Sequence, residues 1–166
     1  MSTELKAFSQ ESDMQRLLGW LRLPHVAEWW GDAREELRAN LTRSPDTNAL
    51  IVEDGVPVGF LCWGRPPQSE LEGAALTDLP EDLVDVDIMI GEPDALGRGV
   101  GPRALGLLLH RLKADASVAF VGIGTAISNE RAIRAYEKAG FRPFREFCDP
   151  DWGSCLYMVV DMRSAG

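Results

Sequence analysis

The sequence lacks long hydrophobic runs and paired cysteines. No apolar stretch in its 166 residues approaches the roughly 20 needed to span a bilayer, and the N-terminus lacks the basic-then-apolar order of a signal peptide. We therefore expect a cytoplasmic protein without membrane partners. The three cysteines form no C-x-x-C pair, and His25 and His110 are far apart in the sequence. The sequence therefore favours neither a disulfide framework nor a metal site.

Basic residues are missing from a stretch that we call the acidic window, Glu70 to Asp94. A field of negative sign repels nucleic acid and attracts cations. The window therefore argues against a nucleic-acid partner and favours a cationic small molecule. The alternative is a solvated acidic loop that only keeps the protein soluble. The net charge is −9, and the window carries this imbalance with Glu70, Glu72, Asp78, Glu81, Asp82, Asp85, Asp87, Glu92 and Asp94.

The hydrophobic periodicity predicts a mixed α/β sheet flanked by helices, and the length fits a single domain over residues 1–166. The strand over 84–90 alternates clearly, which predicts one face with Asp85, Asp87 and Met89 and the other with Val84, Val86, Ile88 and Ile90. Strands are predicted at 5–9, 49–53, 57–63, 84–90, 118–123, 142–147 and 154–161. Helices are predicted at 12–21, 32–41, 101–113 and 128–139, and residues 64–80 are expected to form a loop.

Residues with strong positional preferences mark where several of these elements begin and end. Ser12 and Ser128 are the expected N-caps of the first and last helices. Pro24 is expected to end the first helix, because a proline cannot continue one. The dipeptide Asp54-Gly55 lies between two predicted strands and indicates a tight hairpin turn.

Glycine is concentrated at one point, Gly97-Arg98-Gly99-Val100-Gly101, directly before the helix over 101–113. Glycines there allow several backbone N–H groups to turn inward together, and the helix N-terminus adds the positive end of its dipole. The turn therefore predicts an anion site suited to a pyrophosphate, with Arg98 as an additional cation. Its spacing matches neither a P-loop nor a dinucleotide fingerprint. A plain tight turn is the simpler alternative.

A second motif, Asn129-x-x-Ala132-Ile133-x-x-Tyr136-x-x-x-Gly140-Phe141, lies on the last predicted helix, which Gly140 is expected to end. Taken alone, the motif is typical of a core helix with a packed tyrosine. Together with the Gly-rich turn, it resembles the acetyl-CoA-binding half of the GNAT acetyltransferases. This resemblance implies the GNAT fold, a mixed central β-sheet flanked by helices, in which two parallel strands, here 84–90 and 118–123, splay around acetyl-CoA.

Further segments resemble the aminoglycoside 6′-N-acetyltransferases within that superfamily. The family often has Asp-Pro where this chain has Gly124-Thr125. The resemblance implies an N-acetyltransferase that acts on a primary amine of an aminoglycoside-like polycation, an antibiotic-resistance activity. The segments are His25-Val26-Ala27-Glu28-Trp29-Trp30-Gly31, Asp87-x-x-Ile90-Gly91-Glu92-Pro93, the run from Arg131 to Phe141, and Tyr157-Met158.

The resemblance also implies roles for individual residues. Asp87 is the expected catalytic carboxylate, because an acceptor amine is mostly protonated at pH 7 and must lose a proton before it attacks a thioester. Tyr136 is expected near the coenzyme sulfur, where its hydroxyl can protonate the departing thiolate. The expected cofactor-binding residues are Met89, Ile90, Arg98, Gly99, Val100, Gly101, Asn129, Ala132 and Tyr136. The expected acceptor-binding residues are Trp29, Trp30, Asp85, Asp87 and Asp151.

Several alternatives remain open at this point. Trp29 and Trp30 are adjacent, so we expect one to line the acceptor cleft and the other to pack in the core, in either order. Asp85 can hold a second ammonium group or simply face solvent. The acceptor can also be a siderophore precursor, a polyamine or another small amine. A GNAT-fold protein that senses acetyl-CoA without turnover is a further possibility, against which Asp87 and Tyr136 together argue. The chain is expected to be a monomer or a homodimer.

Overall fold

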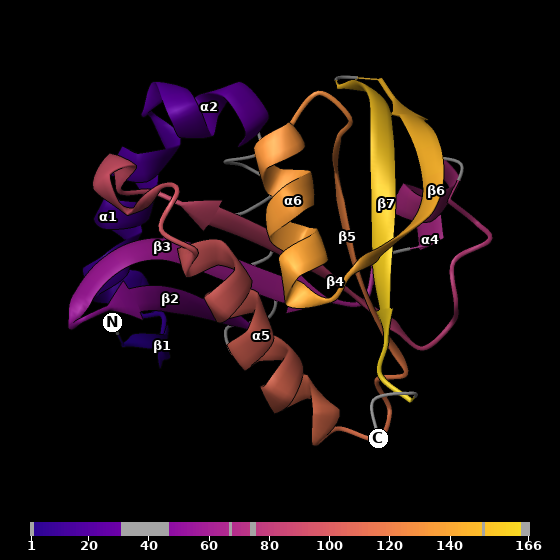
Figure 1. Cartoon of the computed structure of the whole chain (residues 1–166), viewed down its shortest axis with the longest axis horizontal. Helices are drawn as coiled ribbons and strands as arrows, with labels where there is room; N and C mark the ends of the chain where they lie inside the picture. Colours follow the sequence, from indigo (N-terminus) through magenta and orange to yellow (C-terminus); the bar gives the residue numbers. More distant parts are fainter. Residues whose placement is uncertain (1, 31–46, 67, 74–75, 151, 164–166) are drawn as a thin grey trace. The chain divides into compact units, whose positions relative to one another are not determined.

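This computed structural model describes residues 2–30, 47–66, 68–73, 76–150 and 152–163. Within them, seven strands form one sheet (Figure 1). The strands are β1 (Thr3–Ala7), β2 (Asn48–Glu53), β3 (Val56–Gly64), β4 (Leu83–Ile90), β5 (Phe120–Ala126), β6 (Arg142–Asp149) and β7 (Gly153–Asp161). The helices are α1 (Gln10–Leu21), α2 (Pro24–Trp30), α4 (Gln68–Gly73), the 3-10 helix η1 (Pro93–Ala95), α5 (Val100–Lys113) and α6 (Glu130–Ala139).

The sheet is mixed, as the sequence predicts. Its strand order is β1-β2-β3-β4-β5-β7-β6. Strands β4 and β5 are parallel, with pairing from Leu83–Phe120 to Asp85–Gly122. The pairs β1–β2, β2–β3, β5–β7 and β6–β7 are antiparallel. In the described part of the chain, no helix has the length and apolar character that crossing a membrane requires.

The chain divides into two compact units, each made of two separate stretches of sequence. The first unit comprises Met1–Cys62 and Ile88–Ala104, and the second comprises Trp63–Asp87 and Leu105–Gly166. Strand β4 is divided between the units: its residues up to Asp87 belong to the second unit and the rest to the first. That residues 1–166 behave as a single domain stays a prediction.

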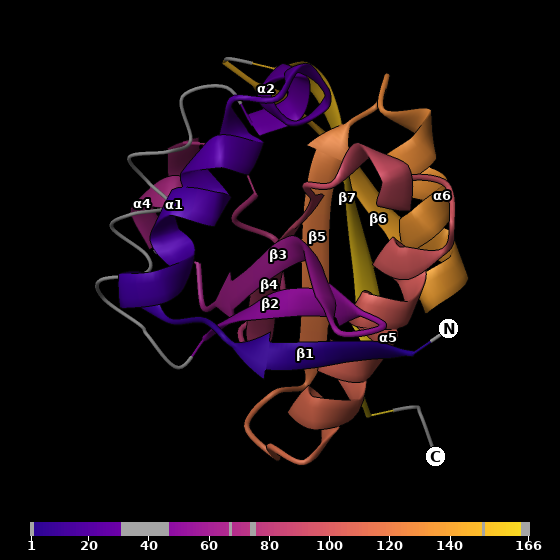
Figure 2. The same ribbon diagram turned by 90° about the vertical axis from the view of Figure 1, so that its left-hand side faces the viewer.

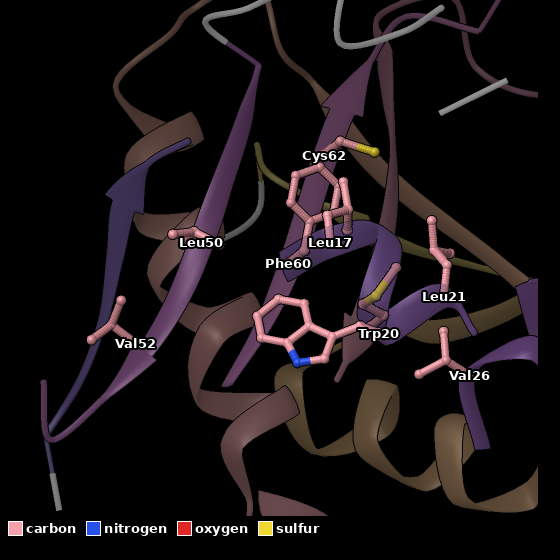
Figure 3. Packing of buried hydrophobic residues seen from close by; sticks show 9 residues of the cluster. Leu17, Trp20, Leu21, Val26, Leu50, Val52, Phe60 and Cys62 are labelled. Carbon is pink, nitrogen blue, oxygen red and sulfur yellow. The ribbon is translucent and has the colours of Figure 1, made fainter. Parts of the chain in front are cut away.

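In the first unit, helix α1 packs on strands that follow one another as β1, β2 and β3 (Figure 2). The apolar residues of α1 recur at helical spacing and therefore form one buried stripe. Asp54 and Gly55 have positive φ angles of 49° and 84°, which confirms the tight hairpin between β2 and β3. The core consists of Leu17, Trp20, Leu21, Val26, Leu50, Val52, Phe60, Cys62 and Met89 (Figure 3).

In the second unit, β5, β7 and β6 form an antiparallel layer with α6 beside it (Figure 1). Leu76, Leu83 and Tyr157 form a small buried cluster there. Gly140 ends α6 with a φ of 108°, as predicted. The following Phe141 is fully buried, and its ring lies 6.3 Å from that of Tyr136. The end of α6 is therefore anchored in the core of this unit.

The first helix begins earlier than the sequence predicts, and Ser12 is not its N-cap. Helix α1 starts at Gln10, with Ser9 in the N-cap position. The Ser9 N–H donates to Asp13 Oδ2 at 2.9 Å, and the Asp13 N–H donates to the Ser9 carbonyl at 2.8 Å. Ser12 lies within the first turn of this helix, so it does not take the N-cap position.

The first helix ends at Leu21, as predicted, and Pro24 itself begins the next helix. At the start of α2 a missing N–H costs nothing, because the first helical turn has no acceptor for it. The expected loop over 64–80 contains the short helix α4, so that prediction was wrong in part. The helix predicted at 32–41 lies outside the described residues.

Two further boundaries differ from the prediction. Helix α6 is capped by Asn129, whose side-chain oxygen accepts a hydrogen bond from the Ala132 N–H at 3.3 Å, and not by Ser128. In β4 the burial does not alternate after Asp87. Met89 is buried at 3% exposure and packs in the core of the first unit, whereas Asp85 is partly buried and Asp87 is exposed.

Candidate active site

The Gly-rich turn lies in the first unit, between η1 and α5. Gly97 and Gly99 have φ angles of 75° and 77°, in the left-handed region that favours glycine. Helix α5 starts directly afterwards at Val100. The first N–H groups of a helix have no intrahelical acceptor and lie at the positive end of its dipole. Pro102 has no N–H, so Val100 and Gly101 are the donors at the helix start. This arrangement fits a pyrophosphate.

The end of β4 is held by a bulge and by a tryptophan of α1. The N–H groups of Gly91 and Glu92 both donate to the Val58 carbonyl, at 2.8 and 3.0 Å, so two residues oppose one. Trp20 Nε1 donates to Glu92 Oε1 at 2.9 Å. The indole covers Gly91 so closely that a Cβ there would lie 2.1 Å from a ring carbon. The backbone that leads from β4 toward the Gly-rich turn is thus fixed by side-chain and main-chain contacts.

Helix α2 brings the predicted acceptor tryptophans into the first unit. His25 Nε2 lies 3.0 Å from the Ile90 carbonyl oxygen, to which it donates, and this bond ties α2 to the end of β4. Trp30 packs against the core of this unit, whereas Trp29 is half-buried. Trp30 is therefore the core-facing member of the pair, and Trp29 is the better candidate for the acceptor cleft.

In the second unit, the structure brings Asp85 and Asp87 of β4 near Tyr136 of α6. The Tyr136 side chain is buried at 8% exposure. Burial is the main cause that raises the pKa of its hydroxyl, and the negative charges of Asp87 and Asp85 raise this pKa further. Asp87 itself is exposed. The two residues predicted to carry out the chemistry therefore interact electrostatically within one unit.

Asp85 is held by a tyrosine that reaches it across strand β5. Tyr157 on β7 donates its hydroxyl hydrogen to Asp85 Oδ1 at 2.8 Å. The ring passes over Gly122 of β5, where a Cβ would lie 2.3 Å from the hydroxyl oxygen. Gly122 is also the parallel-sheet partner of Asp85. The carboxylate of Asp85 is partly buried and oriented, and does not simply face solvent.

Of the residues described above in the two units, three were not predicted from the sequence to have these roles. Trp20 and Gly122 act through contacts with residues far away in the sequence, and Tyr157 was noted only as part of a matching strand. Asn129, a predicted pantetheine contact, uses its side-chain oxygen as the cap of α6. Asp151, a predicted acceptor contact, lies outside the described residues.

Comparison with known proteins assigns this chain to a family. Residues 9–148 match the acetyltransferase (GNAT) domain, so the chain belongs to the GNAT acetyltransferases, which use acetyl-CoA as cosubstrate. It is 30% identical over 159 residues to aminoglycoside N(6′)-acetyltransferase type 1 of Klebsiella pneumoniae, an alignment that covers 90% of this chain and 78% of that protein. The chain is accordingly an acetyl-CoA-dependent N-acetyltransferase.

Solved structures show the same likeness. The aminoglycoside acetyltransferase AAC(6′)-Ib in complex with coenzyme A and kanamycin superposes with a TM-score of 0.82 at 26% identity, covering 98% of this chain and 96% of that one. Its complex with paromomycin and acetyl-CoA gives a TM-score of 0.82 at 26% identity, covering 100% of this chain and 99% of that one. The GNAT fold predicted from the sequence is confirmed.

Proposed function

We propose that this enzyme transfers the acetyl group of acetyl-CoA to a primary amine of an aminoglycoside-like polycation. The observation that carries the proposal is likeness along nearly the whole chain, with 30% identity to an aminoglycoside N(6′)-acetyltransferase over 90% of its length. A solved structure with a TM-score of 0.82 contains kanamycin. Resistance to such antibiotics is the corresponding biological role.

Acetyl-CoA is proposed to bind through its pyrophosphate to the Gly-rich turn. The turn offers backbone donors at a helix N-terminus, and the exposed Arg98 side chain adds a positive charge. Backbone groups at the end of β4 and the start of α6 are the proposed contacts of the pantetheine arm. The residues proposed to contact acetyl-CoA are Met89, Ile90, Arg98, Gly99, Val100, Gly101, Asn129, Ala132 and Tyr136.

Asp87 is proposed to accept the proton of the acceptor ammonium, directly or through one water. The free amine then attacks the thioester carbonyl. The nitrogen of the resulting intermediate gives up its second proton to water. As the intermediate collapses, the C–N bond remains, the C–S bond breaks, and coenzyme A leaves as a thiolate that takes up a proton from solvent. The exposure of Asp87 supports this role, because the carboxylate must meet a substrate that arrives from solvent.

Tyr136 is proposed to stabilise the departing thiolate with a hydrogen bond. Its pKa is raised above the ordinary value of 10.0, mainly by burial and then by the charges of Asp87 and Asp85. A thiol has a pKa of about 8.5, so complete proton transfer from this phenol to the thiolate is uphill. Tyr136 therefore contributes a hydrogen bond, and the proton on the released thiol comes from solvent.

The acceptor is proposed to contact more than its reacting amine. Asp85, oriented by the Tyr157 hydroxyl at 2.8 Å, holds a second ammonium group. Trp29 offers an aromatic face of the kind that binds sugar rings and cations, and Trp30 contributes the part of its ring that is not packed in the core. Asp151 completes the proposed acceptor set, although it lies outside the described residues.

The acidic window is proposed to attract the polycation. Glu81 and Asp82 are exposed, and the field of exposed charges is screened over about 8 Å at physiological ionic strength. We expect the KM of the amine to rise with salt in the wild type. Glu81→Gln/Asp82→Asn should raise this KM at low salt and flatten its salt dependence. Glu137→Gln/Glu146→Gln, which neutralises two exposed acids outside the window, is the matched control. A salt-independent KM in the wild type would refute electrostatic attraction.

The decisive experiment measures release of free thiol from acetyl-CoA with a panel of amines. The panel contains aminoglycosides, polyamines, a hydroxamate-type siderophore precursor and a monocationic amine. The proposal expects the highest kcat/KM with an aminoglycoside. A higher value with another amine would replace the substrate, and tight acetyl-CoA binding without turnover on any amine would favour a sensor.

The cellular setting is part of the proposal. We propose action in the cytoplasm, where acetyl-CoA is available, as a monomer or homodimer formed by single-domain chains. Fractionation of cells tests the location, and light scattering tests the oligomeric state.

A further inference from the structure

We propose that Arg103 is a positioning residue for the Gly-rich turn and sets the affinity for coenzyme A through the carbonyl of Arg98. The inference rests on the proposed binding of acetyl-CoA at this turn. Arg103 Nη1 donates to the Arg98 carbonyl oxygen at 2.9 Å. Arg98 lies between Gly97 and Gly99, which both have positive φ angles. The guanidinium therefore binds the turn at Arg98, beside glycines that allow the backbone several conformations.

The other donors of the same guanidinium reach two strands of the sheet. Nη2 donates to Glu53 Oε1 on β2 at 2.9 Å, and Nε donates to Thr3 Oγ1 on β1 at 2.9 Å. The Thr3 hydroxyl in turn donates to Glu53 Oε2 at 2.5 Å. The Glu53 side chain is only 7% exposed, so its position is fixed. Arg103 thus links the turn to a rigid part of the first unit.

The hydrogen bond to the Arg98 carbonyl also sets the direction in which the Gly99 N–H points. The carbonyl of Arg98 and the N–H of Gly99 belong to one planar peptide unit and point in opposite directions. Holding the carbonyl toward Arg103 therefore aims the Gly99 N–H away from it. This peptide unit turns about ψ of Arg98 and φ of Gly99, and because Gly99 is a glycine the unit would otherwise rotate at little cost. The fixed orientation keeps the donor ready for phosphate, which lowers the ordering cost of binding.

A simple charge effect is the competing explanation, and charge-preserving variants separate the two. Lys keeps the positive charge but lacks the planar fork that reaches three acceptors. Arg103→Lys should weaken the binding of coenzyme A roughly tenfold, the effect of losing a hydrogen bond made by a charged group. Arg111→Lys, in the last turn of the same helix, is the matched control and should leave affinity unchanged.

An acetyl donor without the pyrophosphate distinguishes a lost orientation of the turn from a general disturbance of the structure. S-acetylpantetheine has no pyrophosphate, so its KM with the same amine should be equal in the wild type and in Arg103→Lys. Calorimetry gives the dissociation constant for coenzyme A, and thiol release gives the KM. Equal losses with both donors, or no loss with coenzyme A, would overturn the proposal. A wild type that binds no coenzyme A would instead refute the proposed function.

Two further variants cover the case in which Arg103→Lys is poorly folded. Glu53→Met removes a negative charge, so attraction alone predicts tighter binding of coenzyme A, whereas loss of positioning predicts weaker binding. Arg103→Met/Glu53→Met replaces the whole pair with apolar groups and leaves no buried charge unpaired. This double variant should fold and bind coenzyme A roughly tenfold more weakly. Wild-type affinity in the folded double variant contradicts the proposal.

Discussion

Strand β5 carries two glycines that face the same tyrosine and should respond differently to the same substitution. A Cβ on Gly122 would lie 2.3 Å from the hydroxyl oxygen of Tyr157 and 2.5 Å from its Cε2, which is closer than such atoms approach. A Cβ on Gly124 would meet Tyr157 Cδ1 at 3.4 Å, an ordinary contact. Gly122→Ala therefore has to displace the ring, whereas Gly124→Ala does not.

The loss of folding stability in Gly122→Ala depends on whether the Tyr157 ring stays in place or moves. Overpacking a filled site costs about 1–3 kcal/mol, and a displaced ring gives up the hydrogen bond to Asp85, worth about 1.5–3 kcal/mol when the acceptor is charged. These costs do not add in full, because moving the ring relieves the clash. Alanine also recovers about 0.4–1 kcal/mol from the unfolded state. We expect a net loss of about 2 kcal/mol, which lowers Tm by roughly 4–8 °C in a chain of this length.

Thermal unfolding followed by circular dichroism measures this difference directly. Gly124→Ala should melt within a few degrees of the wild type, because only the small unfolded-state gain of about 0.4–1 kcal/mol applies. Tyr157→Phe should recover part of the loss when combined with Gly122→Ala, since the atom in closest contact is removed. Equal melting temperatures for Gly122→Ala and Gly124→Ala would refute the close approach of Tyr157 to β5.

Three further predictions concern single side chains. Asp87→Asn should reduce acetyl transfer by on the order of 10²-fold, the range for a lost general base, while the dissociation constant for acetyl-CoA stays unchanged; wild-type turnover would contradict the role of Asp87. The chain has two tyrosines, so Tyr157→Phe leaves only Tyr136 to titrate, and its phenolate absorbance should appear well above pH 10 in the folded protein, because burial and then Asp87 raise its pKa. Since the unfolded chain ionises near pH 10, Tyr136 stabilises the fold below that pH and this contribution is lost as the pH rises further; titration near pH 10 in the folded state would show that the phenol is accessible. Cys148 is exposed and Cys155 is buried, and burial raises the pKa of the Cys155 thiol, so a thiol reagent at pH 7 should modify Cys148 first by peptide mass spectrometry, and faster labelling of Cys155 would contradict its burial.

Elements whose cause is local were predicted well. The hairpin at Asp54-Gly55 needs two residues with positive φ, and both the dipeptide and the angles of 49° and 84° agree. Gly140 ends α6 for the same reason. The helix starts were wrong where two capping residues compete. Ser128 and Asn129 are both good caps, and only the reach of the Asn129 side chain to the Ala132 N–H decides between them.

The candidate site was predicted as far as its residues lie in short motifs. The sequence indicated Asp87, Tyr136 and the Gly-rich turn, because each belongs to a contiguous pattern. It did not indicate that Tyr157 holds Asp85. That contact depends on the neighbours of β5 and on the absence of a side chain at Gly122, and strand order is not encoded in local periodicity.

The division of β4 between the two units has a consequence for synthesis of the protein on the ribosome. The first unit needs Ile88–Ala104 as well as its N-terminal stretch. Its core therefore stays incomplete until the chain beyond residue 87 has left the ribosome. The second unit waits for β7, which pairs with both β5 and β6. Neither unit can therefore be produced as an uninterrupted fragment. The nascent chain therefore keeps unpaired strand edges until late in translation, and such edges favour aggregation.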